Sequence, residues 1–379
     1  MPDLPLDPLR ARLAMLGRPH TPGDVAAALR GLGVVVTDAA IAQAMRELRL
    51  ASVGAGRLEP LLQAQGVSDV LVNGPDAVFV DRGGGLERAD LRFADDEEVR
   101  QLATRLAAAA GRRLDDAAPF VDGRLPSGVR LHAVLAPVAA PGTCISLRIP
   151  AVRSQRLQDL VDAGSLPPAG AELLAAVVSA KVPFLISGGT GTGKTTLLSA
   201  LLSLVPGHER IVLVEDAREL DPDHPHCVRL EGRPANGEGT GQIGLTTLVR
   251  QALRMRPDRL VVGEVRGPEL RDLLTALNTG HEGGCGTVHA NSASDVPARL
   301  EALATLAGLT REACHAQVAA ALRVVVHLTR RADGLRRVQG IGILARGEDA
   351  LVQVRPAVSF GSGGVVREDA ARVLDGWLS

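Results

Sequence analysis

The chain has 379 residues, of which 46% are hydrophobic and 22% are charged, so it is long enough for two globular domains. Its formal net charge of −1 argues against a generally cationic protein that coats nucleic acid. Aromatic residues make up only 2% of the chain, which leaves few rings for stacking on single-stranded bases. Nucleic acid is therefore not an expected partner.

The cysteines and the apolar segments favour a cytoplasmic protein. Four cysteines lie far apart and form no CxxC pair, which argues against a disulfide framework and favours a reducing compartment. The N-terminal "MPDLPLDPLRARLAM" has acids and prolines where a signal peptide needs an apolar core. The most apolar central stretch, "LLAAVVSAKVPFLIS", is interrupted by Lys181 and Pro183 and is too short to span a bilayer. A peripheral membrane partner is compatible with this pattern.

The first 150 residues predict two different structures. Residues 1–65 have apolar residues at helical spacing, with Thr21 and Thr37 as N-caps, and predict a helical extension that packs or docks. Residues 66–150 predict a compact α+β domain. It consists of two strands around an Asn-Gly-Pro-Asp turn in "VSDVLVNGPDAVFVDRGG", a helix in "DDEEVRQLATRLAAAAGRRL", and further strands in "GRLPSGVRLHAVLAPVA" and "TCISLRIP".

A linker and a larger α/β domain follow. Residues 151–170 contain a helix-like turn and then "GSLPPAG", which predicts a hinge. From 171 to 379, helical patterns alternate with the short apolar runs "PFLISG", "IVLVED", "RLVVGEV" and "GTVHA". That alternation predicts a parallel sheet with crossover helices.

The segment "GGTGTGKTT" is the strongest chemical signal in the chain. Gly188, four further residues and then Gly193-Lys194-Thr195 satisfy the P-loop pattern, with an apolar strand before it and a helix after it. The glycines let backbone N–H groups converge on phosphates, and the helix N-terminus adds positive potential. Lys194 is expected to reach the β- and γ-phosphates, and the Thr195 hydroxyl to bind Mg²⁺. The pattern is strengthened because only two of the 42 basic residues are lysine. The nucleotide-binding residues predicted here are Gly188, Gly189, Thr190, Gly191, Thr192, Gly193, Lys194, Thr195 and Thr196.

Two further strands end in carboxylates that a P-loop enzyme needs near its metal. Glu264 follows the strand in "RLVVGEVRG" and is predicted to orient or deprotonate the attacking water; a helix-capping role is the alternative. "IVLVEDAREL" ends in Glu215-Asp216, at the strand edge where open α/β sheets bind ligands. For Asp216 the competing interpretation is an N-cap of the following segment.

Arginines near these motifs are candidates for stabilising charge on a departing phosphate. Arg250 and Arg254 are spaced i, i+4 in "TTLVRQALRMRPD", and Arg266 follows Glu264. Because nearly all basic residues of this chain are arginines, a solvated surface charge is the competing interpretation for each of them.

The segment "LNTGHEGGCGTVHAN" places His281, Cys285 and His289 at intervals of four. On a helix this spacing would align three possible zinc ligands on one face. Four glycines within the segment count against a helix, since each costs about 1 kcal/mol there relative to Ala.

In order along the chain, "GGTGTGKTT", "LVEDAREL", "LRMRPDRLVVGEVRGPE" and "TGHEGGCGTVHAN" resemble the Walker A, Asp-box, Walker B and His-box motifs of the secretion ATPases of type II and type IV secretion. Together with "VSDVLVNGPDAVFVDRGG" and the segment from "GRRLDDAAPF" to "LAPVA", the likeness covers roughly residues 60–345. Within the family the chain is most similar to the Flp/Tad pilus assembly ATPases of the CpaF/TadA type. Type II members often carry a late tetracysteine zinc module, which this sequence lacks.

The resemblance implies a fold and a set of roles. The α+β domain would be joined to a RecA-like C-terminal domain, ATP would sit between the two, and six chains would form a ring. Arginines of the N-terminal domain would approach the phosphates, and the matching positions are Arg124 and Arg130, with Arg148 a weaker match. Glu264 falls on the Walker B glutamate and Glu215 on the Asp-box glutamate. His281 and His289 fall on the His box, where they would sense the γ-phosphate with Arg266 rather than bind zinc.

The expected function is therefore a Mg²⁺-dependent ATPase whose ring pushes on an inner-membrane platform protein, to assemble a pilus, secrete protein or drive conjugal transfer. The catalytic residues would be Glu264, Glu215 and Lys194. Two alternatives stay open: a nucleic-acid motor of the conjugation or RecA-like helicase type, and a nucleotide-gated scaffold with little turnover. The intact carboxylates argue against the scaffold.

Overall fold

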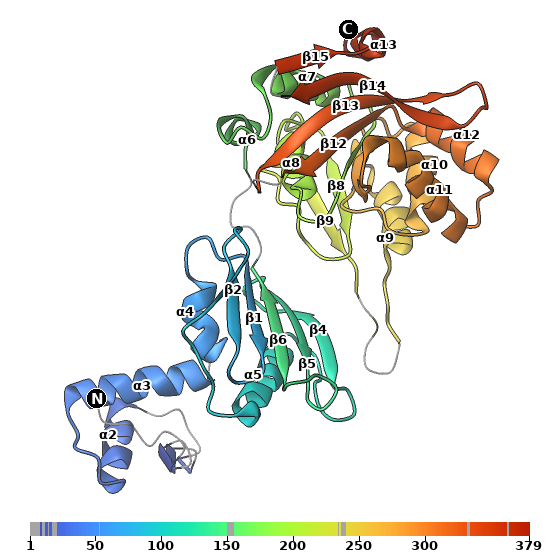
Figure 1. Cartoon of the computed structure of the whole chain (residues 1–379). Helices are drawn as coiled ribbons and strands as arrows, with labels where there is room; N and C mark the ends of the chain where they lie inside the picture. The colour runs from blue at the N-terminus through green and yellow to red at the C-terminus, as the bar shows by residue number, and fades with distance from the viewer. Residues whose placement is uncertain are drawn as a thin grey trace. The chain divides into compact units, whose positions relative to one another are not determined.

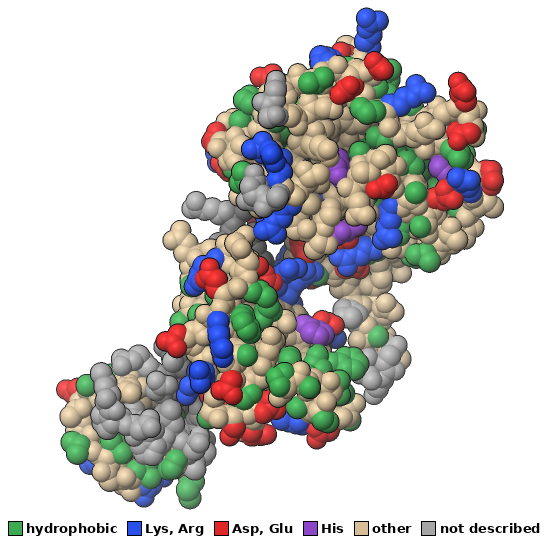
Figure 2. All heavy atoms as spheres, in the orientation of Figure 1, with side chains coloured by type: hydrophobic (Ala, Val, Ile, Leu, Met, Phe, Trp, Pro, Cys, Tyr) green, Lys and Arg blue, Asp and Glu red, His purple; other side chains and the backbone are tan. Residues whose placement is uncertain are grey.

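The computed structural model of the protein describes residues 21–52, 54–149, 155–233, 240–331, 334–361 and 364–379, together with 8–9, 12–13, 15–16 and 235 (Figure 1). The chain divides into two compact units, Met1–Pro150 and Ala151–Ser379. On the face shown in Figure 2, basic and acidic side chains are interspersed over both units, in keeping with the near-zero net charge. Among the described residues, no helix combines the length and the apolar character that crossing a bilayer requires.

The N-terminal unit begins with helices, two of which start at side-chain caps. The helices are α2 (Pro22–Gly31), α3 (Asp38–Ser52), η1 (Gly56–Leu58) and α4 (Glu59–Leu62). The Thr21 hydroxyl accepts a hydrogen bond from the Asp24 backbone N–H, and the Asp24 carboxylate accepts one in return from the Thr21 N–H. Thr37 accepts a hydrogen bond from the Ala40 N–H at 3.1 Å. Both caps predicted from the sequence are confirmed.

A six-stranded antiparallel sheet forms the rest of this unit. Its order is β3-β2-β1-β6-β5-β4. The strands are β1 (Asp69–Asn73), β2 (Val78–Asp81), β3 (Leu86–Arg88), β4 (Phe120–Arg124), β5 (Arg130–Val134) and β6 (Cys144–Arg148). Helix α5 (Asp96–Ala109) begins at an Asp95 cap and packs Val99, Leu102 and Leu106 into the core of the sheet. These elements confirm the strands and the helix predicted for this region.

The C-terminal unit is built on a nine-stranded sheet in the order β15-β14-β13-β12-β7-β11-β10-β8-β9. Strands β12, β7, β11, β10, β8 and β9 run parallel, and β13 to β15 continue the sheet in antiparallel fashion. The bounds are β7 (Phe184–Gly188), β8 (Ile211–Glu215), β9 (Cys227–Glu231), β10 (Arg259–Val262), β11 (Cys285–His289), β12 (Val324–Arg330), β13 (Arg336–Arg346), β14 (Val352–Gly361) and β15 (Gly364–Arg367). The parallel arrangement predicted for β7, β8, β10 and β11 is confirmed.

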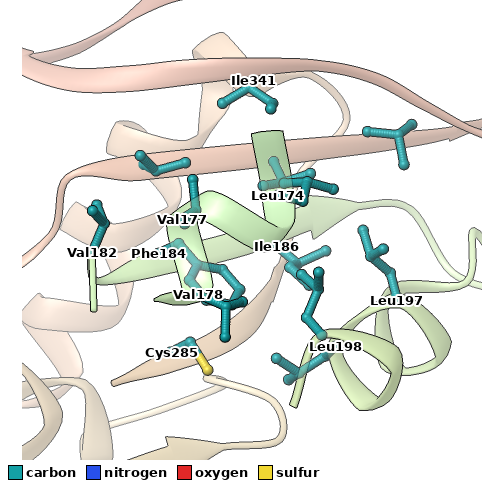
Figure 3. Close-up of a cluster of buried hydrophobic side chains, with 14 of the residues drawn as sticks. Leu174, Val177, Val178, Val182, Phe184, Ile186, Leu197, Leu198, Cys285 and Ile341 are labelled. Atoms are coloured by element: carbon teal, nitrogen blue, oxygen red, sulfur yellow. The ribbon is translucent and has the colours of Figure 1, made fainter. Parts of the chain in front are cut away.

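Helices cover both faces of this sheet, which explains why its central strands are continuous apolar runs. One face packs against α6 (Leu157–Asp162), α7 (Pro168–Ser179), α8 (Lys194–Leu202) and α13 (Ala371–Leu378). Figure 3 shows Leu174 and Val177 facing Ile186, Leu197 and Ile341 in this core. The opposite face packs against α9 (Leu245–Ala252), η2 (Leu253–Met255), α10 (Glu269–Asn278), η3 (Ala293–Asp295), α11 (Val296–Leu306) and α12 (Arg311–Ala321).

The segment predicted as a linker, 151–170, contributes to the C-terminal core. Leu157 of α6 and Leu166 are buried among the side chains of α7 and α8, and the Ser165 carbonyl accepts a hydrogen bond from the Val338 N–H of β13. Pro168 begins α7, as is common for proline at a first helical position. "GSLPPAG" is therefore anchored within this unit. Residues 150–154 lie outside the described residues.

Candidate functional site

The P-loop joins β7 to α8 and has the backbone that only glycine adopts easily. Gly188, Gly191 and Gly193 have φ values of +152°, +71° and +93°. A Cβ on Gly188 would lie 2.5 Å from the Leu328 carbonyl oxygen of β12, which is closer than atoms can pack. The loop also closes on itself, because the Thr192 hydroxyl donates a hydrogen bond to the Gly189 carbonyl. The predicted phosphate-binding loop thus follows a strand and opens a helix, as its pattern requires.

Lys194 is buried and folds back over this loop. Its Nζ donates to the carbonyl oxygens of Gly188 and Gly189 at 3.0 and 2.8 Å. Burial lowers the pKa of Lys194, although the nearby carboxylates of Glu264 and Glu219 oppose that effect. The two carbonyl oxygens are neutral, so they compensate the charge of the buried ammonium only in part. A bound phosphate would give the ammonium an anionic partner.

Glu264 lies beside the P-loop, two residues beyond the end of β10. Its carboxylate accepts a hydrogen bond from the Arg266 guanidinium, and its other oxygen lies 2.9 Å from His289 Nε2. Burial alone would raise the pKa of Glu264, but the hydrogen bond and charge of Arg266, with His289 and Lys194, outweigh it and lower the pKa. The carboxylate is therefore ionised at neutral pH.

His289 ends β11 and lies between the lysine and the glutamate. Its Nε2 lies 3.4 Å from Lys194 Nζ and 2.9 Å from the Glu264 carboxylate. Burial and the charge of Lys194 lower the pKa of His289, so the imidazole is neutral at pH 7. An ammonium can only donate and a carboxylate can only accept, so the shorter distance assigns the Nε2 proton to a hydrogen bond with Glu264.

Two carboxylates at the end of β8, those of Glu215 and Asp216, have different partners. Glu215 is 5% exposed, and its Oε1 accepts hydrogen bonds from the backbone N–H groups of Glu219 and Leu220 at 3.0 and 2.9 Å. Burial raises the pKa of Glu215 against the effect of these two bonds. Asp216 lies 3.9 Å from the Arg266 guanidinium. The structure therefore places the Glu215 carboxylate under the loop that follows it, where it shapes the backbone of residues 219–220.

That loop brings forward Glu219, a residue that the sequence analysis did not single out. The Thr195 hydroxyl lies 3.4 Å from a Glu219 carboxylate oxygen. A hydroxyl and a carboxylate are the hard oxygen ligands that Mg²⁺ prefers, so Thr195 and Glu219 fit the predicted metal. In the sequence, only the position of Glu219 four residues after Glu215 marks it, which is a weak signal. The turn of the chain after β8 is what brings the Glu219 carboxylate to the Thr195 hydroxyl.

The zinc arrangement weighed for His281, Cys285 and His289 does not fit the geometry. Cys285 and His289 lie at opposite ends of strand β11, where four residues span about 13 Å. The Cys285 side chain lies in the hydrophobic core, where burial raises the pKa of its thiol to about 12. His281 lies in the glycine turn, with Nδ1 3.3 Å from the Ala276 carbonyl. Within the described residues, no group of three such ligands is placed to hold a metal.

The remaining predicted arginines fall at different places. Arg266 belongs to the cluster around Glu264, whereas Arg250 pairs with Asp272 of α10 at 3.0 Å, and Arg254 lies in η2. In the N-terminal unit, sheet register places Arg124, Arg130 and Arg148 directly opposite one another on β4, β5 and β6, with Asp69 of β1 next in the row. Arg148 forms an ion pair with Asp69 at 3.0 Å. Directly opposed residues share a face, so three guanidinium groups gather on one side of this sheet.

Comparison with known proteins gives a consistent result. The family described as "Type II/IV secretion system protein" matches residues 51–356. A Mycobacterium tuberculosis protein named for conjugal transfer is 55% identical over 337 residues, which cover 87% of this chain and 95% of that protein. The type IV secretion system protein PtlH of Bordetella pertussis is 35% identical over 312 residues, which cover 74% of this chain and 91% of PtlH.

Solved structures show the same fold. The Legionella pneumophila ATPase DotB aligns with a TM-score of 0.55 at 20% identity, over 78% of this chain and 81% of DotB. The pilus retraction motor PilT with bound ADP aligns with a TM-score of 0.54 at 19% identity, over 85% of each chain. These likenesses confirm the predicted α/β fold, with a RecA-like P-loop unit and an α+β unit before it. On the family match and the two relatives, this chain belongs to the type II/IV secretion system protein family.

Proposed function

We propose that the protein hydrolyses ATP to ADP and phosphate at the P-loop and uses that energy to drive a secretion, pilus-assembly or conjugal-transfer machine. The observation that carries this proposal is the contact chain Lys194–His289–Glu264–Arg266, which joins the P-loop helix, β11 and the end of β10. Groups that bind phosphate and a carboxylate that can direct water thus converge from separate strands at one edge of the sheet.

In this mechanism the backbone N–H groups of Gly189 to Thr196 hold the phosphates, and Lys194 exchanges its two carbonyl partners for phosphate oxygens. Glu264 accepts a hydrogen bond from the attacking water and orients it. Its lowered pKa makes it a weak base, so orientation contributes more than complete proton removal. Neutral His289 donates to Glu264 and so aims the carboxylate.

Arg266 gives the site a means of responding to nucleotide. Its guanidinium now pairs with Glu264 and faces Asp216. A γ-phosphate would compete for this guanidinium and leave Glu264 free to hold water. Thr195 and Glu219 would hold the Mg²⁺ ion, which supplies charge neutralisation on the phosphates when bound. His281, in the turn that leads to β11, is proposed to support His289.

At the level of the assembly, we infer a homohexameric ring in which the arginine row of Arg124, Arg130 and Arg148 reaches bound nucleotide. The support for this role is that sheet register gathers the three arginines on one face of the N-terminal sheet. The ring would act on an inner-membrane platform protein from the cytoplasmic side. The Flp/Tad pilus ATPase type is the proposed subclass, supported by the motifs in the sequence; the conjugal-transfer and PtlH relatives support the broader transport role.

The test is Mg²⁺-dependent ATPase activity per chain over a range of protein concentrations, with Lys194→Ala as the blank. Activity that rises with concentration and is absent from the blank supports a site completed by a neighbouring chain. Activity that is independent of concentration contradicts the trans-acting arginines. If full-length protein neither hydrolyses nor binds ATP, the proposed function is wrong.

A further inference from the structure

The hairpin between β12 and β13 brings two arginines to the P-loop. Strand β12 runs parallel to β7, with Leu328 directly opposite Gly188, where the P-loop begins. The chain continues to Arg330 and returns as β13, whose first residue, Arg336, lies directly opposite Arg330. Both arginines therefore extend past the end of β7, to the same edge of the sheet as the P-loop. Figure 2 shows basic side chains gathered over this end of the hairpin.

Arg336 lies against the last glycine of the P-loop. A Cβ on Gly193 would lie 3.5 Å from Arg336 Cδ, so the stem of the arginine crosses the loop just before Lys194. The Arg336 side chain is exposed, and it forms no hydrogen bond or ion pair with the part of the chain that the structure describes. The surroundings of Arg336 thus favour a negatively charged ligand on the P-loop.

The strand order indicates which part of the ligand this is. His289 ends β11 and Glu264 follows β10, and both strands lie on one side of β7, while β12 and β13 lie on the other side. In the proposed reaction the γ-phosphate faces Glu264, because this carboxylate orients the water that attacks the γ-phosphorus. Arg336 consequently faces the part of the nucleotide that does not react.

We propose that Arg336 binds the α-phosphate of the nucleotide. This inference rests on the proposed ATP-hydrolysing function of the same P-loop. The α-phosphate is present in ATP and ADP alike and its charge does not change during hydrolysis, so Arg336 stabilises bound substrate, transition state and product equally. Such uniform binding changes KM and leaves kcat unaffected.

The experiment compares Arg336→Ala with Arg346→Ala in the full chain. Arg346 ends the same strand and is also exposed, but it lies about 33 Å away along β13, which makes it a matched control. We expect Arg336→Ala to raise the Kd for ADP and the KM for ATP together, each by about tenfold, as for the loss of a hydrogen bond to a charged group. The kcat should stay within about twofold of wild type, since uniform binding does not alter it. Arg336→Lys should recover part of the affinity, and Arg346→Ala should resemble wild type.

Each of three other outcomes would contradict either the assignment of Arg336 or the proposed function. ADP binding by Arg336→Ala that equals wild type overturns the inference and leaves the proposed function standing. A fall in kcat at unchanged KM would place Arg336 on the reacting phosphate and overturns the α-phosphate assignment. Wild-type protein that binds no ADP overturns the proposed function itself, and the inference with it.

Discussion

At the scale of single residues, Glu264 is the group that we propose orients the attacking water. Its carboxylate is ionised at neutral pH and contacts both Arg266 and His289. We expect Glu264→Gln to bind ADP as wild type does and to lose ATPase activity by about 100-fold or more, the usual range for a group that directs proton transfer. Steady-state ATPase assays and ADP titration of the same preparation measure both quantities. Turnover within threefold of wild type would remove Glu264 from the reaction.

The buried Glu215 predicts a pH-dependent difference in stability. Its folded pKa is raised above the ordinary value of 4.5, mainly by burial, so the native state holds this proton more tightly than the unfolded chain. Stability is therefore lost as pH rises from 4.5 through the folded pKa. Glu215→Gln keeps an oxygen for the N–H groups of Glu219 and Leu220 and carries no charge. The Tm of the variant relative to wild type should increase between pH 4.5 and pH 8.

The same variant separates two roles for Glu215. Because its carboxylate shapes the loop that carries Glu219, Glu215→Gln should keep at least about a third of wild-type turnover, as expected when a neutral acceptor maintains both backbone hydrogen bonds. A loss of turnover as large as that of Glu264→Gln, with an unchanged Tm profile, would support the catalytic role predicted for Glu215 from the sequence.

At the scale of elements, the junction of β7, the P-loop and β12 tolerates no side chain at its first glycine. A Cβ on Gly188 would lie 2.5 Å from the Leu328 carbonyl and 2.7 Å from the Thr192 hydroxyl. Gly188→Ala should therefore displace the loop, lower stability by about 1–3 kcal/mol and abolish ADP binding. Gly244→Ala is the control, since that glycine has a φ of −90° and a Cβ there meets nothing within 4 Å. Equal ADP affinities for the two variants would contradict the tight strand-to-loop junction.

The elements also show where sequence patterns stop being informative. Strands β7, β8, β10 and β11 were predictable because each is a short apolar run between turn signals, buried on both faces. Strand β9 has only half-buried residues, and β13 to β15 lie in a region without a clear pattern, so their place in the sheet follows from pairing with strands distant in sequence. "GSLPPAG" suggested flexibility by composition, yet Leu166 beside its prolines fills the core next to α7.

At the scale of the whole molecule, the proposed ring builds each ATPase site from residues of two neighbouring chains. Two variants that are each inactive should therefore recover ATPase activity when they are mixed. Lys194→Ala removes the P-loop lysine, and Arg130→Ala removes the middle member of the arginine row. If the row acts on the nucleotide of a neighbour, a mixture of the two variants contains some sites with both groups intact. Mixing equal amounts should restore about a quarter of wild-type ATPase activity, as random assembly of two chains predicts. A mixture no more active than its components would contradict an arginine row that acts on the nucleotide of a neighbouring chain.

The sequence by itself determined which chemical groups are available to the proposed site: a P-loop, strand-end carboxylates and two imidazoles are local patterns whose spacing reflects the turns and strands that present them. Tertiary structure decided which of these groups meet. The parallel order of β7, β11 and β10 placed His289 in contact with both Lys194 and Glu264. The turn after β8 placed Glu219, and not Glu215, beside Thr195. The hairpin of β12 and β13 added Arg336 from more than a hundred residues away along the chain. These contacts cannot be predicted from local sequence, because they depend on the register and order of strands that pair only when the whole sheet forms.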